Sequence, residues 1–163
     1  MSAEPSSPDP AFQTVSDQIR RHARERPAQP ALIDGETRLD YAGLDALVDR
    51  IAATLQRQGL RPRDVVAICG HGSLHYAAVF LGALRAGAAV APLAPSVTPQ
   101  SFASMLGDAQ AGWLFADSAA LDALAGTSFA GRGVSFDGIA PGIPFTDWLA
   151  PANVRPEPVD VQP

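Results

Sequence analysis

The sequence has few of the groups that crosslink a chain or draw it to polyanions. Cys69 is the only cysteine among 163 residues, which excludes an internal disulfide and fits a reducing compartment, so we expect a cytoplasmic protein. The sequence has 12 basic and 17 acidic residues, which gives a net charge of −5, and it contains no basic run. Nucleic acid and anionic membranes are therefore poor candidates for partners. The opening MSAEPSSPDP lacks a charged-then-apolar pattern, so we expect no export signal.

An uninterrupted membrane span is also missing. The run from Tyr76 to Ala94 is nearly all apolar and comes close to the ~20 residues that cross a bilayer. However, Arg85 would lie in mid-membrane, glycines and Pro92 interrupt the run, and its period changes halfway from helical to extended. We therefore expect no membrane span.

The same region, DVVAICGHGSLHYAAVFLGALRAGAAVAPLAP, predicts a strand, a helix and a second strand. The first strand, Val65 to Cys69, is apolar at both odd and even positions, as in a parallel sheet covered on both faces. Ser73 is placed to cap the helix, Arg85 suits its C-terminal dipole, and Gly87 stands where a left-handed cap is expected. The second strand, Ala88 to Leu93, should pair in parallel with the first.

Weaker patterns of the same kinds fill the rest of the chain. In chain order we expect a helix from Phe12 to Pro27, a hairpin of Ala31 to Ile33 and Thr37 to Leu39, a helix capped by Asp40 and ended by Gly59 and Pro62, a helix begun by Thr98-Pro99, a strand from Gly112 to Ala116, a short helix capped by Ser118 and running through Leu124, a strand from Val134 to Phe136, and a helical turn from Pro144 to Leu149.

These elements predict an α/β fold, layered, with a mainly parallel sheet, flanking helices and an N-terminal β-hairpin. Residues 1–10 are expected to be a disordered lead-in, and residues 11–150 one α/β unit. Residues 151–163 hold four prolines and no periodicity, so we expect a linker to a further part of the protein.

Ligands of open α/β sheets bind beyond the carboxyl ends of the strands, which here means the loops at Gly70 to His75, Pro92 to Thr98 and Asp117-Ser118. The Gly-His-Gly-Ser loop that opens a helix has the ingredients of an anion site. The dinucleotide fingerprint G-x-G-x-x-G would need glycine where His75 stands, so the signal is weak.

Cys69, His71 and His75 suggest a metal site, but no carboxylate or second thiol lies nearby in sequence to complete it. A Cys69-His71 nucleophile pair lacks an orienting group. A buried Cys69 with histidines at a loop edge is the favoured interpretation. The arginines of the first helix could clamp a phosphate, although a solvated helix face explains them as well; they are Arg20, Arg21, Arg24 and Arg26. We therefore assign no catalytic, cofactor-binding or metal-binding residue.

Two segments resemble core motifs of the adenylate-forming (AMP-binding) synthetases, the superfamily of acyl-CoA synthetases and adenylation domains. LDYAGLDALVDRIAATLQRQGLRPRDVVAI is similar to L-T-Y-x-E-L, an amphipathic helix and G-x-x-x-G-D-x-V-A-I, and FLGALRAGAAVAPLAP to L-x-A-x-x-A-G-A-x-x-x-P-L-x-P. SFASMLGDAQAGWLFAD resembles the helix and strand that follow, so the likeness runs from about Phe12 to Asp117. Gly43 departs from the motif's acidic residue, as do Pro62 and Arg63 from its small residues.

The segments that carry the family's chemistry do not occur in this sequence. These are a Ser/Thr/Gly-rich phosphate loop ending in P-K-G, an aromatic-Gly-x-Thr-Glu segment, a Gly-Asp near a hinge and a lysine of a mobile C-terminal domain; this sequence has no lysine. The resemblance thus implies the N-terminal subdomain of a larger enzyme, inactive by itself. The parent would use ATP, Mg²⁺ and coenzyme A to convert a small carboxylic acid to an acyl-CoA through an acyl-adenylate, with feruloyl-CoA synthetase as one candidate.

Two alternatives stay open. One is a non-catalytic binding or interaction module derived from the same scaffold, which predicts a closed, polar surface. The other is a small nucleotide-binding enzyme, which needs a phosphate loop that the sequence does not show. The fragment hypothesis predicts an apolar face over the C-terminal half, and its partner would be the remainder of the synthetase.

Overall fold

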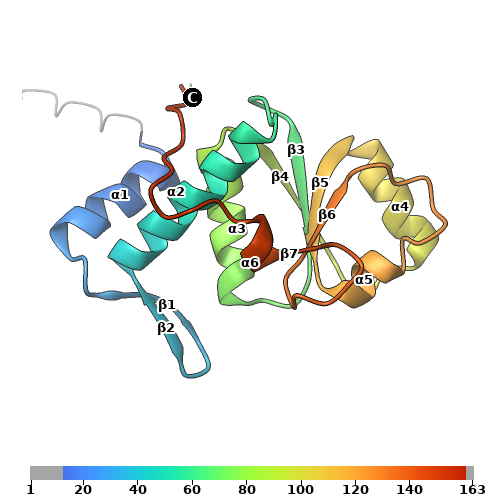
Figure 1. Cartoon of the computed structure of the whole chain (residues 1–163), viewed down its shortest axis with the longest axis horizontal. Helices are drawn as coiled ribbons and strands as arrows, with labels where there is room; N and C mark the ends of the chain where they lie inside the picture. Colours follow the sequence, from blue (N-terminus) through green and yellow to red (C-terminus); the bar gives the residue numbers. More distant parts are fainter. Residues whose placement is uncertain (1–12, 161–163) are drawn as a thin grey trace, which may run out of the picture.

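The structure is a computed structural model that describes residues 13–160 (Figure 1). The expected lead-in, residues 1–10, lies outside the described part. The helices are α1 (Val15–Glu25), α2 (Tyr41–Arg57), α3 (Leu74–Arg85), α4 (Pro99–Asp108), α5 (Ser118–Asp122) and α6 (Phe145–Trp148). The strands are β1 (Pro30–Asp34), β2 (Thr37–Asp40), β3 (Val65–Cys69), β4 (Ala89–Leu93), β5 (Ala111–Ala116), β6 (Arg132–Ser135) and β7 (Ile143–Pro144).

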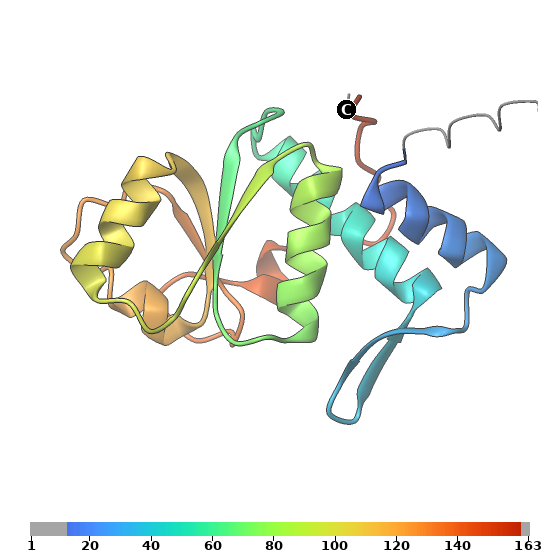
Figure 2. The same ribbon diagram turned by 180° about the vertical axis from the view of Figure 1, so that it is seen from behind.

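A parallel sheet with the order β4-β3-β5-β6-β7 divides the protein into layers. Figures 1 and 2 show α4 and α5 on one face of the sheet and α2, α3 and α6 on the other, with α1 outside α2. The antiparallel hairpin β1-β2 projects beside α2. The expected fold class is confirmed.

The two faces of β3 explain why its sequence is apolar at every position. Val66 and Ile68 point into the core under α2 and α3, whereas Ala67 and Cys69 point into the core under α4 and α5. All four are nearly inaccessible to solvent. A strand buried on both sides has no position left for a polar residue.

Local capping signals in the sequence predict the starts of α2, α3 and α4 correctly, whereas α1 begins at Val15, after a cap at Thr14 that the sequence analysis did not name. The side chains of Asp40, Ser73 and Thr98 each accept a hydrogen bond from the backbone amide three residues on, at 2.7, 3.1 and 3.3 Å. Gly87 follows α3 with φ +86°, as the left-handed cap requires.

The prediction for α5 is wrong in its cap. Ser118 is the first helical residue, and Asp117, the residue at the cap position, makes no side-chain capping bond. Instead, the amide and hydroxyl of Ser118 donate to Asp137, which lies just beyond β6. The sequence analysis also missed β7, which has only two residues.

Helices α2 and α3 pack closely because Gly82 has no side chain. A Cβ at Gly82 would lie 2.5 Å from Cγ2 of Ile51, far inside van der Waals contact. The apolar run that approaches membrane-span length is divided between α3 and β4. Among the described residues, no helix is long and apolar enough to cross a membrane.

Residues 151–160 contain no helix or strand, as expected, but they lie against the protein. Figure 1 shows the segment crossing α2 after α6. Arg155 contacts Asp49 of α2, and Glu157 bonds to Gln56 of the same helix. Whether this segment leads to a further domain stays a prediction.

We predict that Gly87→Val destabilises the protein by about 1–3 kcal/mol, because a β-branched residue resists positive φ. A Cβ there would also lie 2.8 Å from Cγ1 of Val159. Urea unfolding measures the loss. Gly107→Ala is the control, because a Cβ in that α4 position has open space and should stabilise by about 0.5–1 kcal/mol. An unchanged midpoint in Gly87→Val would contradict the left-handed cap.

Candidate functional site

The expected ligand edge of the sheet exists, and the fold brings its loops together. The turn after β3 passes over the residue that follows β5: a Cβ on Gly70 would lie 3.3 Å from Oδ2 of Asp117. His71 Nδ1 lies 3.6 Å from the same oxygen. Asp137, after β6, joins this edge through Ser118. The edge is therefore acidic, which disfavours a phosphate.

Two amides in the first turn of α3 are already used within the protein. Leu74 N donates to Oδ2 of Asp34 at 3.2 Å, which ties the hairpin to this helix. Tyr76 N donates to the hydroxyl of Ser73 at 3.1 Å. An anion at this turn would compete with both contacts, so the structure does not support the phosphate site considered for Gly70 to His75.

The candidate metal and nucleophile residues do not form one site. Cys69 is buried under α4 and α5, and burial raises the pKa of its thiol, with a smaller contribution from Asp117. The side chain of His71 is instead 89% exposed, and the ring of His75 lies tilted against that of Phe145, with the ring centres 4.9 Å apart. Within residues 13–160, no group of three or more potential metal ligands occurs. This agrees with Cys69 as a buried apolar residue.

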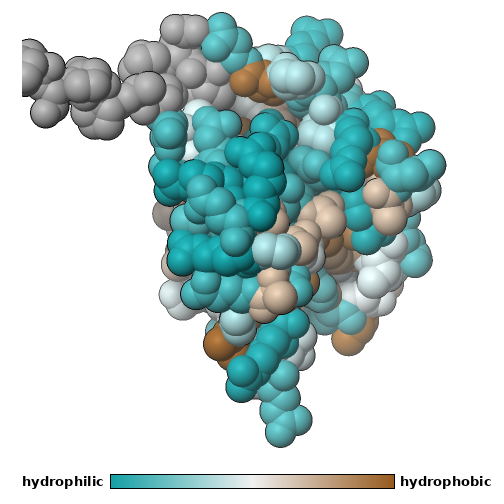
Figure 3. All heavy atoms as spheres, turned by 90° about the vertical axis from the view of Figure 1, so that its left-hand side faces the viewer, coloured by the Kyte–Doolittle hydropathy of each residue, from teal (hydrophilic) through white to brown (hydrophobic). Residues whose placement is uncertain are grey.

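The arginines of α1 diverge instead of converging on one ligand. Arg20 reaches inward to Asp49 at 3.6 Å, whereas Arg26 bonds to His22 and lies over the ring of Tyr41. Figure 3 shows that the face formed by α1 and the hairpin is mostly hydrophilic. Arg21, Arg24 and Arg26 are exposed, as the interpretation of a solvated helix face predicts.

Asp137 organises the acidic edge. Its carboxylate accepts from the hydroxyl of Ser135 at 2.6 Å, from the amide and hydroxyl of Ser118 at 3.0 and 2.7 Å, and from the amide of Ile139 at 3.2 Å. These bonds, led by that from Ser135, hold the pKa of Asp137 far below its usual range. The carboxylate closes the loop after β6 onto the start of α5, which is a structural role.

A buried ion-pair cluster between α2 and α3 was missed by the sequence analysis. Arg85 Nη1 lies 2.7 Å from Oδ1 of Asp45 and 2.8 Å from Oδ1 of Asp49, and its side chain is 1% exposed. Its Nε donates to Ser16 of α1 at 2.6 Å. Burial raises the pKa of Asp49, but the bonds from Arg155 and Arg85 outweigh it, so the pKa stays below its usual value. The cluster joins three helices and residues 151–160.

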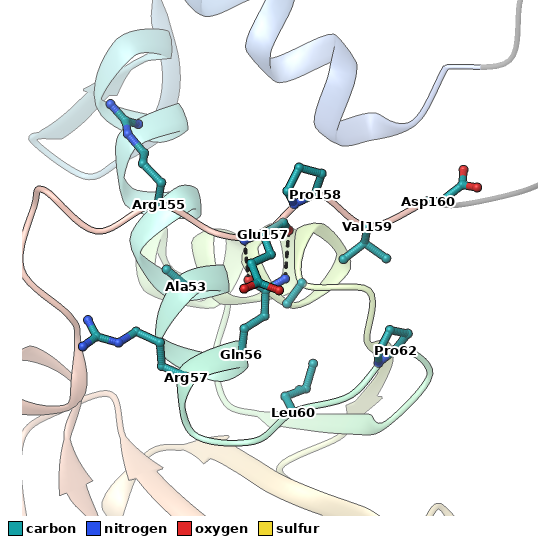
Figure 4. A pocket seen from close by; sticks show the side chains of 11 residues that line it. Ala53, Gln56, Arg57, Leu60, Pro62, Arg155, Glu157, Pro158, Val159 and Asp160 are labelled. Carbon is teal, nitrogen blue, oxygen red and sulfur yellow. Dashed lines mark hydrogen bonds between the residues drawn. The ribbon is translucent and has the colours of Figure 1, made fainter.

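Two hollows flank the segment after residue 156. One, of about 460 Å³, is lined by the end of α2, Leu60 and Pro62 (Figure 4). The other, of about 580 Å³, lies between α1, the end of α3 and the same segment. Each is lined by mixed acidic, basic and apolar groups, and neither adjoins the acidic edge of the sheet.

Comparison with known families identifies the fold. The AMP-binding enzyme family matches residues 19–151, which is most of the chain. This chain belongs to that family. The resemblance seen in the sequence is thereby confirmed at the level of the superfamily and of its N-terminal subdomain.

Members of several kinds are similar to it. A component of the linear gramicidin synthase of Brevibacillus parabrevis is 36% identical over 96 residues, which are 59% of this chain and 1% of that protein. A protein assigned as a long-chain-fatty-acid CoA ligase of Rhodopseudomonas palustris CGA009 superposes with a TM-score of 0.82 at 25% identity, over 90% of this chain and 39% of that one.

The nonribosomal peptide synthetase FmoA3, solved with α-methyl-L-serine-AMP bound, superposes with a TM-score of 0.76 at 26% identity. The match covers 94% of this chain and 16% of that one. This AMP-binding chain therefore spans well under half of each of these relatives. None of the three is a feruloyl-CoA synthetase.

We predict that Arg85→Met lowers the free energy of unfolding by about 3–5 kcal/mol, because Asp45 loses its buried counter-charge and Asp49 loses one of its cationic partners. Urea unfolding at pH 7 tests this. Arg24→Met is the matched control, since Arg24 is exposed on α1 and its loss should change stability by less than about 0.5 kcal/mol. Equal unfolding midpoints for the two variants would refute the role given to Arg85.

We predict that the thiol of Cys69 is inert in the folded protein. Its burial and raised pKa keep it protonated and out of reach of reagents. Titration with a chromogenic disulfide should show about one thiol in denaturant and almost none without it. Rapid labelling of Cys69 under native conditions would contradict this prediction and would support Cys69 and His71 as a reactive pair.

Proposed function

We propose that this chain is the N-terminal scaffold of an adenylate-forming enzyme that activates a carboxylic acid with ATP, and that the chain is inactive alone. The family match over residues 19–151 carries this proposal. In the parent reaction the carboxylate oxygen attacks the α-phosphorus of ATP, and pyrophosphate leaves. A thiol then attacks the acyl carbon, and AMP leaves.

The described residues offer no ready-made site for the nucleotide. No group of three or more potential metal ligands occurs among them, and the amides of Leu74 and Tyr76 at the start of α3 are occupied. We therefore assign no step of the reaction to residues of this chain. Their contribution is one layered wall of the large domain, to which the remainder of the synthetase attaches as the partner.

We favour coenzyme A as the thiol acceptor, which makes the parent an acid–thiol ligase. Superposition on the assigned fatty-acid CoA ligase over 90% of this chain supports this choice. A second candidate is the amino-acid-activating part of a peptide synthetase, supported by the 36% identity to the linear gramicidin synthase component. Feruloyl-CoA synthetase is kept only as one member of the first class, and a cytoplasmic location is proposed from the single cysteine.

The family match favours the fragment over an independent interaction module. The apolar face expected over the C-terminal half is small, however. Met105, Ile139 and Ile143 are the large apolar side chains exposed there within the described residues, at 42, 60 and 45%. The surface left for the remainder of the enzyme is thus more polar than the sequence analysis predicted.

We predict that the purified chain, given ATP, Mg²⁺ and a panel of carboxylic and amino acids, shows no acid-dependent exchange of labelled pyrophosphate into ATP. The physical reason is the lack of a phosphate loop in this sequence. Acid-dependent exchange by the chain alone would overturn the proposal.

A native mass measurement on material from the source cell extends this test. A mass that resolves on denaturation into this chain and a longer piece indicates an assembled synthetase. The exchange assay on that complex then reports which acid is activated, and release of AMP on addition of coenzyme A reports the thiol step. Aryl or fatty acids with such release support the ligase, and amino acids without it support the peptide synthetase.

A further inference from the structure

The segment expected to be a linker is held by side chains of one helix, α2. We call Ala150 to Val159 the strap. At its start, Arg50 Nε donates to Ala150 O at 2.8 Å, and Ala150 N donates to the hydroxyl of Thr54 at 2.9 Å. Arg50 and Thr54 both belong to α2, so the first residue of the strap is held to this helix through the main chain of Ala150.

Further along, Gln56 binds the main chain of Glu157 in both directions. Its Nε2 donates to Glu157 O at 3.0 Å, and its Oε1 accepts from Glu157 N at 2.8 Å (Figure 4). The side-chain amide thus imitates the neighbouring strand of a β-ladder. A helix can in this way present the hydrogen bonds that a sheet edge normally offers.

The prolines of the strap suit this mode of binding. Pro156 and Pro158 flank Glu157 and have no N–H. The N–H of Glu157, which donates to Gln56, is therefore the one backbone donor of this tripeptide. Proline also restricts the chain to extended conformations before docking, which lowers the entropy lost on binding. The proline-rich composition that suggested a linker therefore also suits a docked segment.

Two side chains anchor the strap at fixed positions. Arg155 Nη1 lies 2.7 Å from Oδ2 of Asp49, whose other oxygen is paired with Arg85. Val159 packs against Gly87, where a Cβ would come within 2.8 Å of its Cγ1. Gly87 thus serves both the left-handed cap and the close approach of the strap.

We propose that the face of α2 from Asp49 to Gln56 is a recognition surface for this extended segment, which docks and detaches without unfolding the helices. The docked strap brings the chain to Gly87, two residues before β4, the edge strand of the sheet. The remainder of the enzyme would then begin from a fixed point. That last consequence rests on the proposed function, whereas the docking does not.

Hydrogen exchange on the whole chain tests the proposal. We expect the amide of Glu157 to exchange at least about 100-fold more slowly than in a free peptide of residues 149–160. Gln56→Leu should remove about tenfold or more of this protection while the amides of α2 and α3 keep theirs. Gln100→Leu, the same change at an exposed position of α4, should leave the strap unchanged.

Arg155→Met provides a second variant, because it removes the ionic anchor and leaves the main-chain contacts in place. It should weaken protection of the strap by severalfold, and Arg24→Met should not. Exchange of Glu157 at the free-peptide rate in the unmodified chain would overturn the docking. If a variant lost protection equally in the strap and in α3, the proposal that the strap detaches independently of the helices would be overturned. Neither result depends on adenylation activity.

Discussion

The guanidinium of Arg85 is enclosed by protein, and its charge is balanced by Asp45 and Asp49 of the neighbouring helix. An isolated charge at this depth would be strongly unfavourable, so the positions of α2 and α3 are linked to each other. Ser16 ties α1 to the same guanidinium, and Asp49 extends the cluster to Arg155. The helical layer on this side of the sheet is therefore arranged around one buried cation.

Close packing of α2 against α3 brings the charged groups of this cluster within contact of one another. Gly82 lies on α3, three residues before Arg85, and its lack of a side chain allows α3 to approach Ile51 of α2. The apolar core beneath, with Val66, Ile68 and Phe115 of the sheet, fills the space between the helices and the strands. Ionic and apolar contacts thus reinforce the same arrangement.

The edge of the sheet where ligands usually bind is built differently. Asp117 and Asp137 make it acidic, and Asp34 and Ser73 occupy amides at the start of α3. These contacts stabilise turns and leave no complete catalytic constellation among residues 13–160. This arrangement fits the supporting role that we propose for the chain.

The sequence alone determined the local elements, because their signals act within about four residues: the caps Asp40, Ser73 and Thr98, the turn at Gly87, and the two-sided apolar pattern of β3. It also indicated the family through ordered motifs. Only the tertiary structure decided which charges meet. Asp137 caps a helix 19 residues earlier, and Arg155 pairs with Asp49 at a separation of 106 residues. Such contacts depend on strand order and on how helices cross, and no local periodicity encodes either.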